Sequence, residues 1–346
     1  MIAVAVAALL VCLAGLVAAY SRMLPPATLV GSLAQSAACA LAGAAPWLAL
    51  APLGALPAPE RLHWPIAALG AIAGFLVSLA VRAAGAGVLR TLAFTAVWSA
   101  LVFVPAAALG FAARPLGLGP YAPLDHGGAL SLHIAAGAAV AGVLLIRAAG
   151  PTMPGAGSIA SAIAAPIVIV LGWLGWLVAA DLDLERLSMP IIVNGCVAGL
   201  GAVLGWLGVQ RIRGRRPTSG GVTAGVLCGL VAVSAGAPLL TPVSAAASGV
   251  FAGALAAWLV LARVDRTGRI LWFVAGSHVM AGAVGMLFLG LLANELGYIF
   301  TGQTEFILGQ LGAALAVALW SGAIAAALAF ALVPAVPVGL AAGDDG

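Results

Sequence analysis

The sequence predicts an all-α polytopic membrane protein with about eleven transmembrane helices. Of its 346 residues, 64% are hydrophobic and only 7% are charged, whereas globular proteins are about 45–50% apolar and about 25% charged. A spanning helix needs roughly 20 apolar residues, and proline, glycine and arginine divide the chain into stretches of that length. These stretches lie near residues 2–20, 27–50, 65–83, 90–112, 128–148, 158–180, 188–210, 221–240, 243–262, 270–293 and 307–335.

The arginines predict the orientation of these helices, because basic residues favour the cytoplasmic side of a membrane. With the N-terminus outside, every arginine except Arg61, Arg114 and Arg186 falls in an inner loop, Arg82 included, and most acidic residues fall outside. We therefore expect a plasma-membrane protein with its N-terminus outside and its C-terminus in the cytoplasm. The stretch 2–20 has no basic residue before it, which indicates a retained first helix and not a cleaved signal peptide.

Composition and motifs exclude several classes of function. The arginines lie in separate short loops without an aromatic-lined motif, so no nucleic-acid partner is expected. Their one cluster, RIRGRRP at 211–217, either orients the chain or contacts anionic headgroups or an acidic cytoplasmic partner. No Ser-His-Asp set, Walker loop or HExxH motif indicates an enzyme. The four cysteines lie in apolar stretches without CxxC spacing, and we expect them to be small buried residues: Cys12, Cys39, Cys196 and Cys228.

One short motif occurs twice. His133 begins HIAAGA and His278 begins HVMAGA, in the fifth and tenth predicted spans. Because these two helices cross the membrane in opposite directions, the pattern indicates an inverted-topology repeat, with the functional site near the membrane midplane. We predict a single membrane domain made of two inverted five-helix repeats, 1–149 and 158–293, followed by an extra helix at 307–335.

Each histidine lies at a similar depth below a predicted helix boundary. His133 is eight residues, or roughly 12 Å, beyond Asp125, and His278 is about as far beyond Arg269. In a hydrocarbon core about 30 Å thick, the two imidazoles approach the middle from opposite faces. Intramembrane ionisable groups are costly and favour functional roles, and a neutral imidazole pair shares a proton without carrying a fixed charge. The alternatives are structural histidines and a bis-histidine haem site. Apart from the haem of such a bis-histidine site, no cofactor or metal is expected.

Several segments resemble motifs of ammonium transporters and Rhesus-type proteins. Residues 125–133 match the family's D-F-A-G-G-x-V-V-H segment with the same Asp-to-His interval, and GSHVMAGAVG at 276–285 is similar to the segment that carries its second histidine. Further matches follow in the family's order: WSALVFVP at 98–105, LGWLGW at 171–176 and GVLCGLVAVSAGAPLLTP at 225–242.

The resemblance implies a homotrimer with one narrow apolar pore per subunit. Ammonium is recruited at an outer vestibule and gives up its proton, and ammonia then passes the twin histidines. Carried over, His133 and His278 are the twin pair, Asp125 is a structural acid at the outer mouth, and Trp176 is a candidate pore gate. An aspartate before a helix also accepts hydrogen bonds from the first backbone N–H groups of the helix, which have no partner within it. The expected partners are ammonium or ammonia, the lipid bilayer and a cytoplasmic regulatory protein.

Some family motifs are altered. The vestibule motif P-x-A-H-W-x-W-G corresponds to PAAALGFA at 105–112, so Leu109 and Phe111 occupy its aromatic positions as candidate vestibule residues. No phenylalanine aligns with the first pore gate, and RILWF at 269–273 replaces an acidic run. Two function classes follow. One is low-affinity conduction of ammonia, ammonium or a similar small molecule; the other is a non-transporting sensor or structural protein.

Overall fold

The protein is a helical bundle, seen here in a computed structural model that describes residues 1–20, 29–112, 118–147, 159–180, 184–262 and 269–335. Within those ranges, nine apolar helical stretches are long enough to cross a membrane, and two shorter apolar stretches, Ala164–Ala180 and Ser219–Val233, accompany them. These stretches fall where the sequence predicts its spans. The all-α fold and the number of about eleven spans are therefore confirmed.

The helical segments that build the bundle follow one another along the chain. They are α1 (Ile2–Tyr20), α2 (Leu29–Leu50), α3 (His63–Ala83), α4 (Val88–Trp98), η4 (Ser99–Phe103), α5 (Val104–Gly110), η6 (Ala129–Ile134), α6 (Ala135–Ile146), α7 (Ile159–Ala180), α8 (Leu184–Ile212), α9 (Ser219–Val233), α10 (Pro242–Ala262), α11 (Arg269–Leu292) and α13 (Glu305–Leu332). Short helical turns lie between them: η2 (Ala51–Leu53), η3 (Glu60–Leu62), η5 (Gly119–Tyr121), η7 (Ala237–Leu239) and α12 (Tyr298–Thr301).

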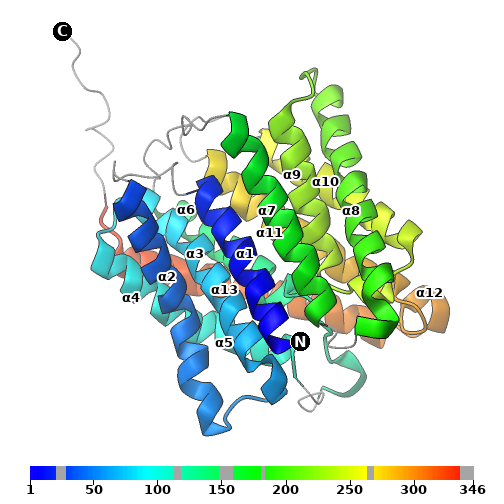
Figure 1. Ribbon diagram of the computed structural model, residues 1–346, viewed down its shortest axis with the longest axis horizontal. Coiled ribbons are helices and arrows are strands. Elements are labelled where there is room, and N and C mark those ends of the chain that lie inside the picture. The colour runs from blue at the N-terminus through cyan, green and yellow to red at the C-terminus, as the bar shows by residue number, and fades with distance from the viewer. Residues whose placement is uncertain (21–28, 113–117, 148–158, 181–183, 263–268, 336–346) are drawn as a thin grey trace.

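The helices pack in a way that surrounds η6 and α6. Helix α1 lies beside α7 across the face shown in Figure 1, with α2 and α4 toward one side and α8, α9 and α10 toward the other. Helix α8 packs on α9 and α10, whereas α6 packs on α13, α11 and α3. The chain from η6 into α6 is therefore enclosed by helices from both halves of the sequence.

Glycines allow α6 and α11 to approach closely. A Cβ added at Gly137 would lie only 2.9 Å from the Cβ of His278, and one added at Gly282 would lie 2.7 Å from Cγ1 of Ile134. Small residues let transmembrane backbones pack at short range. Here they bring the two histidine-bearing segments into contact.

Two predictions from the sequence are wrong. Arg82 is not a loop residue: it lies inside α3 at 4% exposure, and its guanidinium donates to the hydroxyls of Ser36 and Ser32 at 3.2 and 3.3 Å. Cys196 is exposed on α8, although the other three cysteines are buried. Apolar composition cannot separate lipid-facing from protein-facing positions, because lipid tails are as apolar as leucine.

Candidate functional site

Asp125 organises the start of η6. Its Oδ1 accepts hydrogen bonds from the backbone N–H groups of Gly128 and Ala129 at 2.9 and 2.7 Å. Its Oδ2 accepts from the N–H groups of Leu130 and Ser131 at 3.0 and 3.1 Å, and from the Ser131 hydroxyl at 3.2 Å. One carboxylate thus satisfies the N–H groups that a helix N-terminus leaves without intrahelical partners.

The carboxyl of Asp125 is buried, at 3% exposure. Burial raises its pKa to about 6, and the four backbone hydrogen bonds oppose that rise. The N–H groups around the carboxyl favour its ionised form, which accepts hydrogen bonds at both oxygens.

The helix begins with a widened turn. Gly128 has φ +96°, a left-handed conformation that favours glycine, and its carbonyl accepts from the N–H of His133, five residues on, at 3.0 Å. Such π-type turns are frequent at functional sites. A second turn of this kind occurs at Ser99–Phe103. The sequence predicted an ordinary helix at both places, because composition carries no signal for the extra residue in the turn.

The two histidines predicted to meet are in direct contact. The Nδ1 atoms of His133 and His278 lie 3.0 Å apart, and their ring centroids are 5.1 Å apart with an angle of 18° between the planes. Both side chains are buried, at 2% and 6% exposure. The Nε2 atom of His133 has no hydrogen-bond partner.

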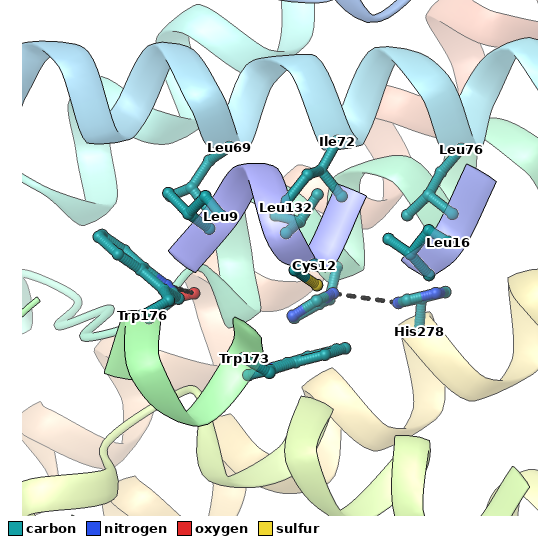
Figure 2. Close-up of a pocket in the computed structure, with 12 residues that line it drawn as sticks. Leu9, Cys12, Leu16, Leu69, Ile72, Leu76, Leu132, Trp173, Trp176 and His278 are labelled. Carbon is teal, nitrogen blue, oxygen red and sulfur yellow. Dashed lines mark hydrogen bonds between the residues drawn. The ribbon is translucent and has the colours of Figure 1, made fainter. Parts of the chain in front are cut away.

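A narrow apolar cavity of about 10 Å³ runs along the histidine pair. Figure 2 shows Leu69, Ile72 and Leu76 of α3 on one side of it and the indole rings of Trp173 and Trp176 of α7 on the other. The rest of the lining comes from α1, η6 and the segment before it: Leu9, Cys12, Leu16, Gly127 and Leu132. A volume of this size holds about one water molecule. Apart from the two imidazoles and the Cys12 thiol, every described side chain of the lining is a leucine, an isoleucine or an indole.

Known proteins share this architecture. The sequence model of the Ammonium Transporter Family matches residues 4–340. The chain belongs to this family. An ammonium transporter of Bacillus subtilis (strain 168) is 29% identical over 208 residues, which cover 59% of this chain and 50% of that protein. The chain thus spans about half the length of that curated relative.

Solved structures share the fold at lower identity. The crystal structure of Saccharomyces cerevisiae Mep2 superposes with a TM-score of 0.79 at 20% identity, covering 94% of this chain and 83% of that one. A structure named as a sensor Amt protein superposes with a TM-score of 0.74 at 18% identity, covering 96% and 91%. This member of the Ammonium Transporter Family is therefore a multi-pass membrane protein with the Mep2 fold.

Trp173 is a site residue that the sequence analysis did not single out. Its ring stacks on His133 with centroids 4.8 Å apart and 17° between the planes, and its Nε1 donates to the Ser234 hydroxyl at 2.8 Å. The same indole therefore fixes the position of one histidine of the pair. The motif LGWLGW at 171–176 contains both Trp173 and Trp176. Their spacing in the sequence does not show which of the two indoles faces an imidazole.

Trp176 lines the narrow cavity. It is 1% exposed, and its Nε1 donates to the carbonyl of Gly127 at 3.0 Å. The N–H of Gly127 in turn donates to the carbonyl of Ser234 at 2.7 Å, at the end of α9. These contacts hold the indole in place, and a gate role for Trp176 stays a prediction.

The two candidate vestibule residues lie apart from the cavity. Phe111 is buried at 7% exposure, Leu109 is partly buried, and neither lines the narrow cavity. Between them, a Cβ at Gly110 would lie 2.9 Å from the Cβ of Asp125. The segment therefore packs behind Asp125, and a vestibule role for Leu109 and Phe111 stays a prediction.

The histidine geometry bears on the haem alternative. Because His133 and His278 hydrogen-bond to each other directly, no porphyrin fits between their rings. Among the residues that the structure describes, no group of three or more His, Cys, Asp or Glu side chains is placed to hold a metal ion.

Proposed function

We propose that this protein conducts ammonia through the narrow cavity beside His133 and His278, drawing on ammonium as its source. The observation that carries the proposal is the hydrogen-bonded imidazole pair in the wall of a water-sized apolar cavity. Family membership and the half-length similarity to ammonium transporters support the choice of substrate.

The passage favours a neutral molecule over an ion. A charged group loses its hydration on entering an apolar site, and that loss is very costly without a compensating charge. No acidic side chain is among the described residues that line the passage, so ammonium meets no compensating charge from them. Ammonia is the size of water and carries no charge, so it pays a much smaller desolvation penalty. We therefore infer that ammonium releases its proton before the narrow part.

The imidazole pair offers ammonia both kinds of hydrogen bond. When one Nδ1 donates to the other, the first ring keeps a lone pair on its Nε2 and the second carries N–H on its Nε2. His133 Nε2 is buried without a partner, so it is the free position for a passing molecule. Trp176 acts in this proposal as the gate at one end, and Asp125 holds the η6 turn that presents His133.

The wider setting follows the sequence predictions. We propose an outside N-terminus, a cytoplasmic C-terminus, a plasma-membrane location and a homotrimer, with a cytoplasmic regulatory protein as partner. We also propose that the bundle comprises inverted repeats at 1–149 and 158–293 plus the helix at 307–335. The placement of the two histidines on α11 and the η6–α6 segment supports the repeat.

Flux measurement in proteoliposomes tests the proposal. Vesicles loaded with a pH-sensitive dye and given an inward ammonium gradient should become alkaline inside faster than protein-free vesicles, because entering ammonia takes up a proton. The His133→Ala variant should lose most of the excess rate. An excess rate of zero in the wild-type protein, at every gradient tried, would overturn the proposal.

A non-transporting sensor is the second candidate function. It rests on the fold similarity to the sensor Amt protein, which has a TM-score of 0.74. Saturable ammonium binding to the purified protein without any vesicle flux would favour it.

A further inference from the structure

A second, larger cavity of about 540 Å³ lies beyond the narrow one. Three helices connect the two cavities. Tyr20 lies one turn beyond Leu16 on α1, and Ile169 lies one turn before Trp173 on α7. Phe273 lies five residues before His278 on α11. A helix rises 1.5 Å per residue, so on each of these helices the lining residues of the two cavities are about 6–8 Å apart along the axis. In the proposed orientation the large cavity lies on the cytoplasmic side of the histidine pair.

The walls of this inner cavity are mainly apolar, with a cationic rim. Ile169, Leu227 and Phe273 are among the apolar lining residues. Arg215 and Arg216 also line the cavity, and both are exposed. No acidic residue is among the described residues of the lining. The rim therefore attracts anions and repels cations.

Polar side chains are also part of the cavity wall. Trp206 is 4% exposed, and its ring packs edge-on against Phe273 with centroids 5.8 Å apart. Gln210 Nε2 donates to the Thr218 hydroxyl at 3.2 Å. The indole nitrogen of Trp206 and Oε1 of Gln210 are both fully enclosed and have no hydrogen-bond partner. These two side chains therefore shape the wall, and the arginines at the rim are the groups that can meet the charge of a ligand.

We propose that the inner cavity binds a small organic anion, a phosphate or carboxylate carried on an apolar body, and that the bound anion closes the inner mouth of the pore. Arg215 and Arg216 pair with the charged group, and the apolar walls, to which Trp206 and Phe273 belong, cover the body. The volume falls in the range of about 300–1,000 Å³ typical of small-molecule sites. The closing effect rests on the proposed function; the binding does not.

The same arginine cluster supplies a matched control. Arg213 stacks over the ring of Trp258 at 4.2 Å, and neither Arg213 nor Arg211 lines the cavity. The double variants Arg215→Gln/Arg216→Gln and Arg211→Gln/Arg213→Gln remove equal charge from one short segment. Only the first pair removes it from the cavity.

Calorimetric titration of the full-length protein in neutral detergent tests the binding. Phenyl phosphate should bind to wild type, roughly tenfold or more weakly to Arg215→Gln/Arg216→Gln, and normally to Arg211→Gln/Arg213→Gln. Phenyl glucoside, the neutral analogue, and inorganic phosphate, which lacks the apolar body, should both bind more weakly than phenyl phosphate. Equal losses in the two double variants, or equal binding of the neutral analogue, would overturn the proposal.

Two further experiments ask whether the bound anion is a free small molecule or a lipid, and whether its binding slows the flux. The titration is repeated in phosphatidylcholine nanodiscs with and without phosphatidylglycerol. Binding of the lipid without any binding of phenyl phosphate would overturn the assignment to a free small anion. In vesicles, phenyl phosphate should slow wild-type flux but not that of Arg215→Gln/Arg216→Gln. If the wild-type protein fails to conduct, the proposed function fails, and the titration alone decides whether the anion site exists.

Discussion

The Nδ1 atoms of His133 and His278 lie 3.0 Å apart, between residues separated by 145 positions in the chain. At that distance one Nδ1 carries a hydrogen and donates it in a hydrogen bond to the lone pair of the other Nδ1, since two N–H groups cannot face each other. The two side chains therefore act as one unit, and each depends on the other for its tautomer.

We predict that the double variant His133→Ala/His278→Ala loses no more ammonia flux than the worse of the two single variants. Residues that act as a unit give strongly non-additive losses, and each single change already leaves an unpaired imidazole. Each single variant should lose at least about tenfold in excess flux. Stopped-flow recording of vesicle pH measures all three variants, with His63→Ala as control because His63 bonds to the Ala58 carbonyl away from the cavity. Additive losses would contradict the prediction.

The parts of this site that sequence could predict were those with a periodic or repeated signal. Long apolar stretches gave the spans, and the repeated His-x-x-Ala-Gly-Ala pattern gave the pair. The stacking of Trp173, the burial of Arg82 and the cavity at Arg215 had no such signal. Each of these features depends on contacts between side chains of different helices. A single sequence does not show which helices pack together, so it does not predict these contacts.

Removal of the Asp125 carboxylate should destabilise the protein. In Asp125→Ala, the four backbone N–H groups that this side chain accepts from remain buried without partners, and unsatisfied buried donors cost about 1–3 kcal/mol each before relaxation. Because the η6 turn can relax, we expect a net loss of about 2–4 kcal/mol in the free energy of unfolding. Denaturant unfolding in detergent measures it, and Glu60→Gln, which changes an exposed acid, is the control. Unchanged stability of Asp125→Ala would show that the turn does not depend on this carboxylate.

Cys12 gives a size test of the narrow cavity. Its side chain lines a cavity of about 10 Å³, so a larger side chain at this position fills the space. Cys12→Leu should therefore lose most of the excess flux, whereas Cys12→Ser, which keeps the size of the side chain, should retain it. Cys196→Leu should also conduct like the wild-type protein, since Cys196 is exposed on α8 outside the cavity. Unchanged flux in Cys12→Leu would show that the conducting path does not run beside Cys12.

In the proposed pore Trp176 is the gate at one end of the passage, so its replacement should change selectivity by size. Its indole packs into the cavity wall and is fixed by the bond from Nε1 to the Gly127 carbonyl. In Trp176→Ala the removed ring opens the cavity, and methylammonium-driven flux should rise relative to ammonium-driven flux by about tenfold. Trp176→Phe keeps most of the ring but loses the bond, and should give a smaller rise.

Trp320 provides the matched control for this prediction. Its Nε1 also donates to a backbone carbonyl, that of Leu101 at 2.8 Å, but its side chain is 52% exposed and lies outside the narrow cavity. Trp320→Phe therefore loses the same kind of hydrogen bond without altering the passage, and its flux ratio should match that of the wild-type protein. If Trp176→Phe and Trp320→Phe changed the ratio equally, the effect would come from general loosening of the bundle. If Trp176→Ala left the ratio unchanged, the narrowest point would lie at the histidine pair and not at Trp176.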